Sequence, residues 1–137
     1  MTDRDLMELA TEARKNAYAP YSGFRVGAAL LTADGRVYTG CNIENAAYTP
    51  TNCAERTAFF KAVSEGAREF TAIAVTGGSG EDPAAFCAPC GVCRQVMAEF
   101  CDDSFRIVLG NQEAIRVYTQ KEILPLSFSP KDLEEQA

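Results

Sequence analysis

Three cysteines and one glutamate stand in two short segments, and their spacing is typical of a metal centre. Cys53 and Glu55 lie two residues apart, and Cys90 and Cys93 form a Cys-x-x-Cys pair. Three thiolates can bind one zinc ion and leave its fourth position open, which distinguishes a catalytic zinc from a structural one. The chain contains no histidine, so its chemistry must proceed without imidazole. Glu55 would then be placed to move protons beside a metal-bound water.

Each of the two segments is expected to begin a helix. Asn52 can serve as the N-cap of the first helix, which would put Cys53 at the first helical position, and Pro89 is a helix-start signal for the second. Cys90 and Cys93 are three residues apart and would share one helix face. The two helix N-termini would then point at one place, where their N–H groups and macrodipoles favour the thiolates that zinc needs.

The negative charge of such a site must also be compensated by nearby positive charge. Three thiolates and Zn²⁺ leave one net negative charge, which would weaken the metal as a Lewis acid and raise the pKa of its water. The helix dipoles offset a part of this charge. Arg56 follows Glu55 in the sequence and could offset more by donating to a thiolate sulfur.

The rest of the chain alternates helical and strand patterns. The expected helices are 3–17, 53–64 and 91–100, with a short helical turn at 121–124. The expected strands are 25–32, 37–41, 71–76, 105–109 and 115–119, with a flexible loop at 77–83. This order predicts an α/β fold in which a layered sheet is flanked by helices.

Length, composition and charge limit the class of protein. A chain of 137 residues with 47% apolar residues suits a single domain over residues 1–137. No apolar run of about 18 residues and no secretion signal stand out, so neither a membrane nor export is expected. A net charge of −6 without a basic cluster disfavours nucleic acid and favours a small neutral partner. Six cysteines in such a chain indicate metal-binding thiols in the reducing cytoplasm.

Longer motifs around these residues resemble the zinc-dependent cytidine deaminases, and in particular their small homotetrameric branch with three cysteine ligands. The matching motifs are 19–22, 24–30, 40–48, 52–58 and 89–95. The resemblance covers most of the chain and implies a three-layer α-β-α fold with a five-stranded mixed sheet. It also implies one zinc ion per subunit, assembly as a homotetramer, and a hydrolase that acts on a cyclic amidine C–N bond. Cytidine and deoxycytidine would become uridine and deoxyuridine in pyrimidine salvage, with release of ammonia.

The resemblance also assigns roles to matching residues. Glu55 would take a proton from the zinc-bound water and deliver it to the pyrimidine ring. The zinc ligands would be Cys53, Cys90 and Cys93. The substrate-binding residues would be Asn42 and Glu44 at a ribose hydroxyl, Phe24 and the backbone of Ala54 at the base, and Ala46, Tyr48 and Phe128 reaching in from neighbouring subunits. A carboxylate at the sugar fits a neutral nucleoside, because it would repel a nearby phosphate.

Plainer interpretations of single residues stay open at this point. Cysteines at helix starts could be core residues, and Cys87 or Cys41 could complete a closed four-cysteine zinc site. Glu55 could be a capping residue three positions after Asn52. Asn42 and Glu44 could simply be solvated residues at the end of a strand and not bind substrate. Phe24 and Phe128 could be core or interface residues.

Three other functions would share part of this pattern. A deaminase of a cytosine-bearing antibiotic such as blasticidin would use the same zinc motifs, although the 42–45 ribose motif argues against it. A nucleic-acid editing deaminase is disfavoured by the acidic balance of the chain. A non-enzymatic interaction module stabilised by zinc would be excluded by an open position on the metal.

Overall fold

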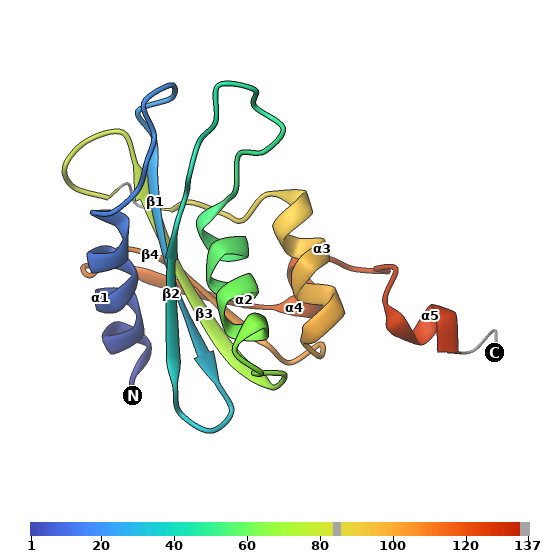
Figure 1. Ribbon diagram of the computed structural model, residues 1–137. Coiled ribbons are helices and arrows are strands. Elements are labelled where there is room, and N and C mark those ends of the chain that lie inside the picture. Colours follow the sequence, from blue (N-terminus) through green and yellow to red (C-terminus); the bar gives the residue numbers. More distant parts are fainter. Residues whose placement is uncertain (84–85, 135–137) are drawn as a thin grey trace.

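The computed structural model describes residues 1–83 and 86–134. The helices are α1 (Asp3–Arg14), α2 (Ala54–Ser64), α3 (Gly91–Phe100), α4 (Gln120–Ile123) and α5 (Pro130–Glu134) (Figure 1). The strands are β1 (Arg25–Thr32), β2 (Val37–Cys41), β3 (Phe70–Gly78), β4 (Arg106–Gly110) and β5 (Ile115–Thr119). Within the part of the chain that is described, no helix has the length and apolar character that crossing a membrane requires.

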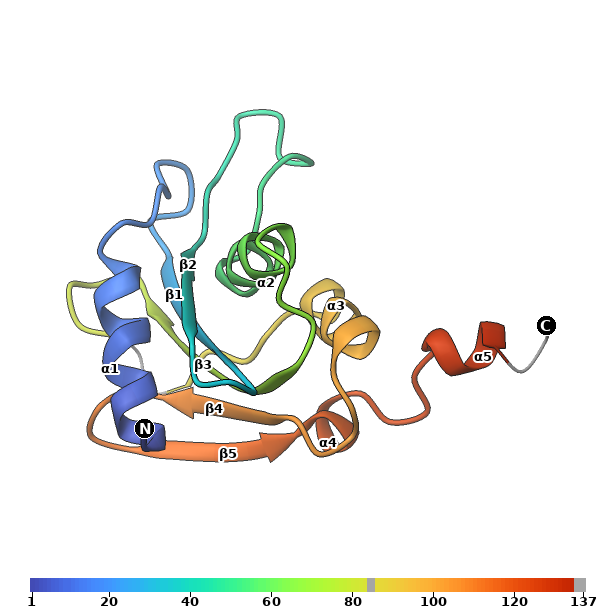
Figure 2. The same cartoon turned by 60° about the horizontal axis from the view of Figure 1, so that its bottom comes forward.

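The five strands form one mixed sheet in the order β2-β1-β3-β4-β5. β3 and β4 run parallel, and the other neighbouring strands run antiparallel. α1 covers one face of the sheet, and α2 and α3 cover the other (Figures 1 and 2). The three-layer α-β-α fold with a five-stranded mixed sheet, expected from the sequence, is therefore confirmed.

Alternating side chains along the strands supply both faces of the core. In β1, Ala28 and Leu30 belong to the apolar cluster formed with α2 and α3, whereas Ala29 belongs to the cluster under α1. β3 follows the same rule, with Ile73 on the first side and Ala72 on the second. This period of two is what a strand covered on both faces requires. Small side chains face α1 and let this helix lie close to the sheet.

Gly27 in β1 marks the closest approach of α1 to the sheet. A Cβ atom at this position would lie 2.0 Å from the carbonyl oxygen of Ala10 and 2.5 Å from the amide nitrogen of Arg14. Both are backbone atoms of α1, so no side-chain rotation could relieve the clash. We expect Gly27→Ala to lower the free energy of unfolding by about 3 kcal/mol or more in denaturant titration.

Gly80→Ala is the matched control, because a Cβ atom there would meet nothing closer than 4.0 Å. This substitution should change the free energy of unfolding by less than about 0.5 kcal/mol. Equal effects of the two substitutions would contradict the close packing of α1 against β1.

Some element bounds differ from the sequence prediction. α1 ends at Arg14 and not at Ala17, because the chain turns so that Tyr18 can pair with Ile43. β3 extends to Gly78, since β1 pairs with it along its whole length. The sequence pattern did not predict α5, although a proline at its first position and an Asp132 carboxylate that accepts from the amide of Ser129 are ordinary helix-start signals.

Candidate active site

α2 and α3 both begin directly after a cysteine. Cys53 is the N-cap of α2 with φ −76° and ψ 157°, and Cys90 is the N-cap of α3 with φ −68° and ψ 167°. Neither thiol makes the side-chain hydrogen bond by which an N-cap usually satisfies the first turn. Both sulfurs therefore remain available to another partner at the positive ends of two helix dipoles.

The expectation that Asn52 caps α2 is wrong, and so is the placement of Cys53 inside the first turn. The backbone of Asn52 exchanges two hydrogen bonds of 2.9 Å with Ile43, which holds Asn52 in an extended bridge before the helix. Its side-chain Nδ2 donates to Thr57 Oγ1 at 3.1 Å. The helix therefore begins one residue later than expected, and Asn52 and Glu55 form no capping box.

The sulfurs of Cys53, Cys90 and Cys93 form one compact cluster. The Sγ atom of Cys90 lies 3.7 Å from that of Cys53 and 3.5 Å from that of Cys93, and the three atoms lie within 4.8 Å of one another. A disulfide would need about 2 Å. Zn–S bonds of about 2.3 Å in a tetrahedron place sulfurs about 3.8 Å apart. The donor set therefore fits zinc, with one coordination position left over.

Cys87 and Cys41 stand outside this cluster. Among the described residues, the metal-binding group that includes Cys53 contains no fourth side chain. The sulfur of Cys87 lies beside Gly77. A Cβ atom added to Gly77 would lie 3.0 Å from this sulfur. Burial raises the pKa of Cys87 to about 11, which disfavours the thiolate that a ligand must supply. In the described part of the chain, neither residue closes a four-cysteine site.

Arg56 lies against the sulfur cluster. Its Nη2 donates to Cys53 Sγ at 3.3 Å, and its buried Nε has no hydrogen-bond partner within the described residues. Hydrogen bonds from the Cys93 thiol and then from Arg56 lower the pKa of Cys53 to about 5, although burial opposes them. The same pairing, together with burial, raises the pKa of Cys93. In the metal-free protein, the negative charge of this coupled pair therefore favours Cys53, and the proton favours Cys93.

Removing Arg56 tests its contribution to the metal site. We expect Arg56→Ala to weaken zinc binding about 10- to 100-fold, because a group that donates to a ligand sulfur stabilises the thiolate. The pH–rate profile should also move to higher pH. Competition with a chromophoric chelator measures the affinity.

Arg68→Ala is the control, since Arg68 donates to the carbonyls of Val63 and Ala67 at the other end of α2. If Arg56→Ala leaves both zinc affinity and the pH–rate profile as they are in Arg68→Ala, Arg56 does not compensate the charge of the thiolates.

Glu55 is the second residue of α2, and its side chain is only 4% exposed. Burial, followed by the negative charge of Cys53, raises its pKa to about 7, although a backbone hydrogen bond and the charge of Arg56 oppose the shift. A carboxyl group with a pKa near neutrality can accept and donate protons at the same working pH. The sequence alone left a capping role open for this residue, but a buried carboxyl group beside three sulfurs is better suited to proton transfer.

Asn42 and Glu44 both hold the segment that leads into β1. Asn42 Nδ2 donates to the carbonyl of Phe24 at 2.8 Å, and its Oδ1 accepts from the amide of Val26 at 2.9 Å. The carboxylate of Glu44 accepts from the amides of Tyr21 and Ser22 at 3.0 and 3.1 Å and also from the Ser22 hydroxyl. These two candidate substrate residues therefore position Phe24 and its neighbours.

Ser22 has no role that the sequence predicts, although this residue stands in the matched 19–22 motif. Its hydroxyl donates to Glu44, which lies 22 positions further along the chain. No local pattern indicates a contact of that kind. Only the fold, which brings the segment before β1 beside the segment after β2, reveals it.

The remaining candidate substrate residues divide between the core and projecting segments. Ala54 is fully buried at the start of α2, and Phe24 is partly exposed. Ala46 and Tyr48 lie in the long connection between β2 and α2, which projects beyond the sheet (Figure 1). Phe128 is exposed on the tail that follows α4 in the chain. Its carbonyl accepts from Nε2 of Gln95, a residue of α3, at 2.8 Å. The last three side chains are thus presented outward by the single chain.

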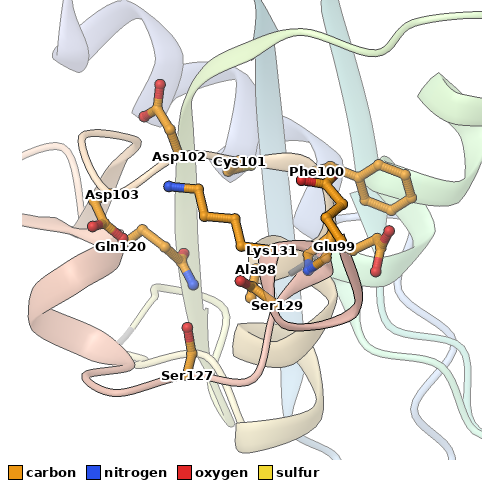
Figure 3. A pocket seen from close by; sticks show the side chains of 12 residues that line it. Ala98, Glu99, Phe100, Cys101, Asp102, Asp103, Gln120, Ser127, Ser129 and Lys131 are labelled. Atoms are coloured by element: carbon orange, nitrogen blue, oxygen red, sulfur yellow. The ribbon is translucent and has the colours of Figure 1, made fainter. Parts of the chain in front are cut away.

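A separate pocket of about 450 Å³ lies between the end of α3, the loop that follows it and residues 127–134. Figure 3 shows Lys131 of α5 extending across this pocket toward the loop that carries Asp102 and Asp103. Neither Glu55 nor any cysteine of the sulfur cluster lines it. This pocket is therefore separate from the group of possible metal ligands at the beginnings of α2 and α3.

Three sulfurs that fit zinc with an open position, beside a buried carboxyl group, are the arrangement of a zinc-dependent hydrolase. Residues 1–109 match the family model described as the cytidine and deoxycytidylate deaminase zinc-binding region. The chain belongs to this family, and it binds zinc through Cys53, Cys90 and Cys93.

Individual relatives support the same assignment. A cytidine deaminase of Sporosarcina psychrophila is 54% identical over 129 residues, which cover 93% of this chain and 92% of the relative. The crystal structure of a cytidine deaminase from Burkholderia pseudomallei superposes with a TM-score of 0.86 at 51% identity, covering 93% of this chain and 100% of that one. A blasticidin-S deaminase of Bacillus cereus is 30% identical over 131 residues, 93% of this chain and 92% of that relative.

Proposed function

We propose that this protein is a cytidine deaminase of pyrimidine salvage, which hydrolyses cytidine and deoxycytidine to uridine and deoxyuridine and releases ammonia. The observation that carries the proposal is the buried carboxyl group of Glu55, with a pKa of about 7, at the same helix start as the zinc ligand Cys53. The 54% identity to a cytidine deaminase supports the substrate class.

Glu55 moves the protons of the reaction. When bound, zinc supplies a water of lowered pKa that can attack C4 of the cytosine ring. Glu55 accepts one proton from the attacking water and delivers it to the ring nitrogen. It then takes the second proton from the same oxygen, now bound to C4, and passes it to the amino group, so that the C4–N bond breaks, the C4 carbonyl forms and ammonia leaves. Arg56 holds the thiolate form of Cys53. Burial of Glu55 keeps its pKa close to neutrality, where both directions of transfer are accessible.

A neutral nucleoside fits the polar groups better than the alternatives do. The carboxylate of Glu44 would repel a phosphate next to the sugar, which disfavours nucleotides and nucleic acid. Beyond their hydrogen bonds within the chain, Asn42 keeps one N–H donor and Glu44 keeps one acceptor position. A sugar hydroxyl can accept from the first and donate to the second. The blasticidin-S deaminase is the less similar relative, at 30% identity against 54%.

The proposed enzyme is a cytoplasmic homotetramer whose sites draw residues from several subunits. Leu126 and Phe128 are exposed on the tail that follows α4 and extends away from the sheet (Figure 1). Tyr48 is exposed on the connection between β2 and α2. Apolar side chains presented in this way indicate an interface with other copies. Six free thiols fit a reducing compartment. Light scattering coupled to size exclusion measures the assembly.

The decisive experiment follows the ultraviolet absorbance of cytidine with the zinc-loaded protein, and repeats it after treatment with a chelator. Loss of cytidine that stops on chelation and returns with added zinc supports the proposal. Parallel assays with cytidine monophosphate and blasticidin S compare the rival substrates. A higher kcat/KM for either rival than for cytidine would overturn the substrate assignment.

A further inference from the structure

The carboxylate of Glu44 has nearly all of its hydrogen-bonding positions occupied within the chain. A carboxylate has about four acceptor positions, two on each oxygen. The amides of Tyr21 and Ser22 both donate to Oε1, at 3.0 and 3.1 Å. The hydroxyl of Ser22 donates to Oε2. One acceptor position therefore remains on Oε2, and the position of the Ser22 hydroxyl determines where it points.

The Ser22 hydroxyl also contacts the segment that carries the aromatic side chain of Phe24. It accepts from the amide of Phe24 at 3.0 Å while it donates to Glu44. The carbonyl of Phe24 in turn accepts from Nδ2 of Asn42 at 2.8 Å. One hydroxyl thus links the carboxylate proposed for the sugar to the residue proposed for the base.

We propose that Ser22 is a positioning residue of the nucleoside site, which orients the remaining acceptor of Glu44 toward a single sugar hydroxyl. The inference rests on the proposed function and deepens it. Asn42 Nδ2 keeps one N–H, and Glu44 Oε2 keeps one acceptor position. A hydroxyl can accept from the first and donate to the second. Without the Ser22 hydroxyl the carboxylate loses the contact that fixes Oε2.

A substrate without the 2′ and 3′ hydroxyls of the sugar separates this role from a structural one. In 2′,3′-dideoxycytidine the ring hydroxyls are absent, so the orientation of Glu44 has nothing to act on. We expect Ser22→Ala to lower kcat/KM for cytidine about tenfold, chiefly through KM, because a hydrogen bond to a charged group is weakened. For 2′,3′-dideoxycytidine, kcat/KM should change by less than about twofold. Ser22→Thr keeps the hydroxyl and should restore most of the activity on cytidine.

Ser104→Ala is the matched control. Ser104 also donates to a carboxylate, that of Asp102, through its hydroxyl at 2.6 Å and its amide at 3.0 Å, but in the loop after α3. It should leave both substrates unaffected. Thermal unfolding of each variant checks that the fold is retained.

Three results would overturn the Ser22 proposal. Equal losses on cytidine and 2′,3′-dideoxycytidine would show a general structural effect. No loss on cytidine would show that the hydroxyl does not orient Glu44. Wild-type protein that leaves cytidine unchanged would instead overturn the proposed function, and the Ser22 proposal with it.

Discussion

Glu55→Gln retains zinc but loses almost all turnover of cytidine. We expect kcat to fall by about 10²- to 10⁴-fold, because the amide of glutamine has nearly the shape of the carboxylate but cannot accept and return a proton. The sulfur cluster does not involve this side chain, so metal binding should persist. The zinc content of the purified variant, measured beside its steady-state kinetics, separates loss of proton transfer from loss of metal.

The control for this substitution is Glu12→Gln on α1, where Glu12 is exposed and pairs with Lys15. It makes the same chemical change far from the sulfur cluster and should leave kcat unaltered. Substantial activity in zinc-loaded Glu55→Gln would refute the role of Glu55 in proton transfer.

The stability of the metal-free protein gives a second measure of the same carboxyl group. Folding raises the pKa of Glu55 from 4.5 to about 7, so the folded state binds its proton more tightly than the unfolded state does. The stabilisation is complete below pH 4.5 and is lost as the pH rises through about 7. Glutamine does not ionise, so metal-free Glu55→Gln should gain stability over the wild type across this window, by about 3 kcal/mol at its upper end. Urea titrations at pH 5 and pH 8 measure the gain.

The layers of the fold could be predicted because each element carries its own periodic signal. Ala28, Ala29 and Leu30 alternate between two apolar clusters, and such a period is visible in the sequence without any long-range information. The same applies to the apolar stripe of α1. Element boundaries were less accurate, as at the end of α1, because pairing between distant segments decided them.

The start of α2 was mispredicted for a reason that is itself informative. Asparagine is a strong N-cap residue and cysteine is a poor one, so local preference favours Asn52. The structure places Cys53 there instead, where its sulfur faces those of the other two ligands. Local preference gives way where function requires another residue. The contact between Ser22 and Glu44 shows a different limit, since it joins two loops that only the fold brings together.

Loss of zinc is expected to produce the largest change in stability. A ligand that binds only the folded state stabilises it by about 4 kcal/mol when its free concentration is a thousand times its dissociation constant. Chelation should therefore lower the unfolding temperature of the wild type strongly. Cys53→Ala removes one of three sulfurs and the acceptor of the Arg56 hydrogen bond. We expect this variant to bind no zinc at micromolar metal and to unfold at one temperature with or without chelator.

Cys101→Ala separates metal loss from the loss of a packed sulfur. Cys101, like Cys53, is partly buried and packs against the core cluster, but it lies outside the sulfur cluster. Its substitution should cost packing energy alone, so the unfolding temperature should still respond to chelator as in the wild type. In the wild type, the shift of the unfolding temperature on chelation should also be smaller at acid pH. Zinc competes with protons for the thiols, and the pKa of Cys93 is raised in the metal-free state. If chelator shifts Cys53→Ala and Cys101→Ala equally, the metal does not depend on Cys53, and the three-sulfur assignment fails.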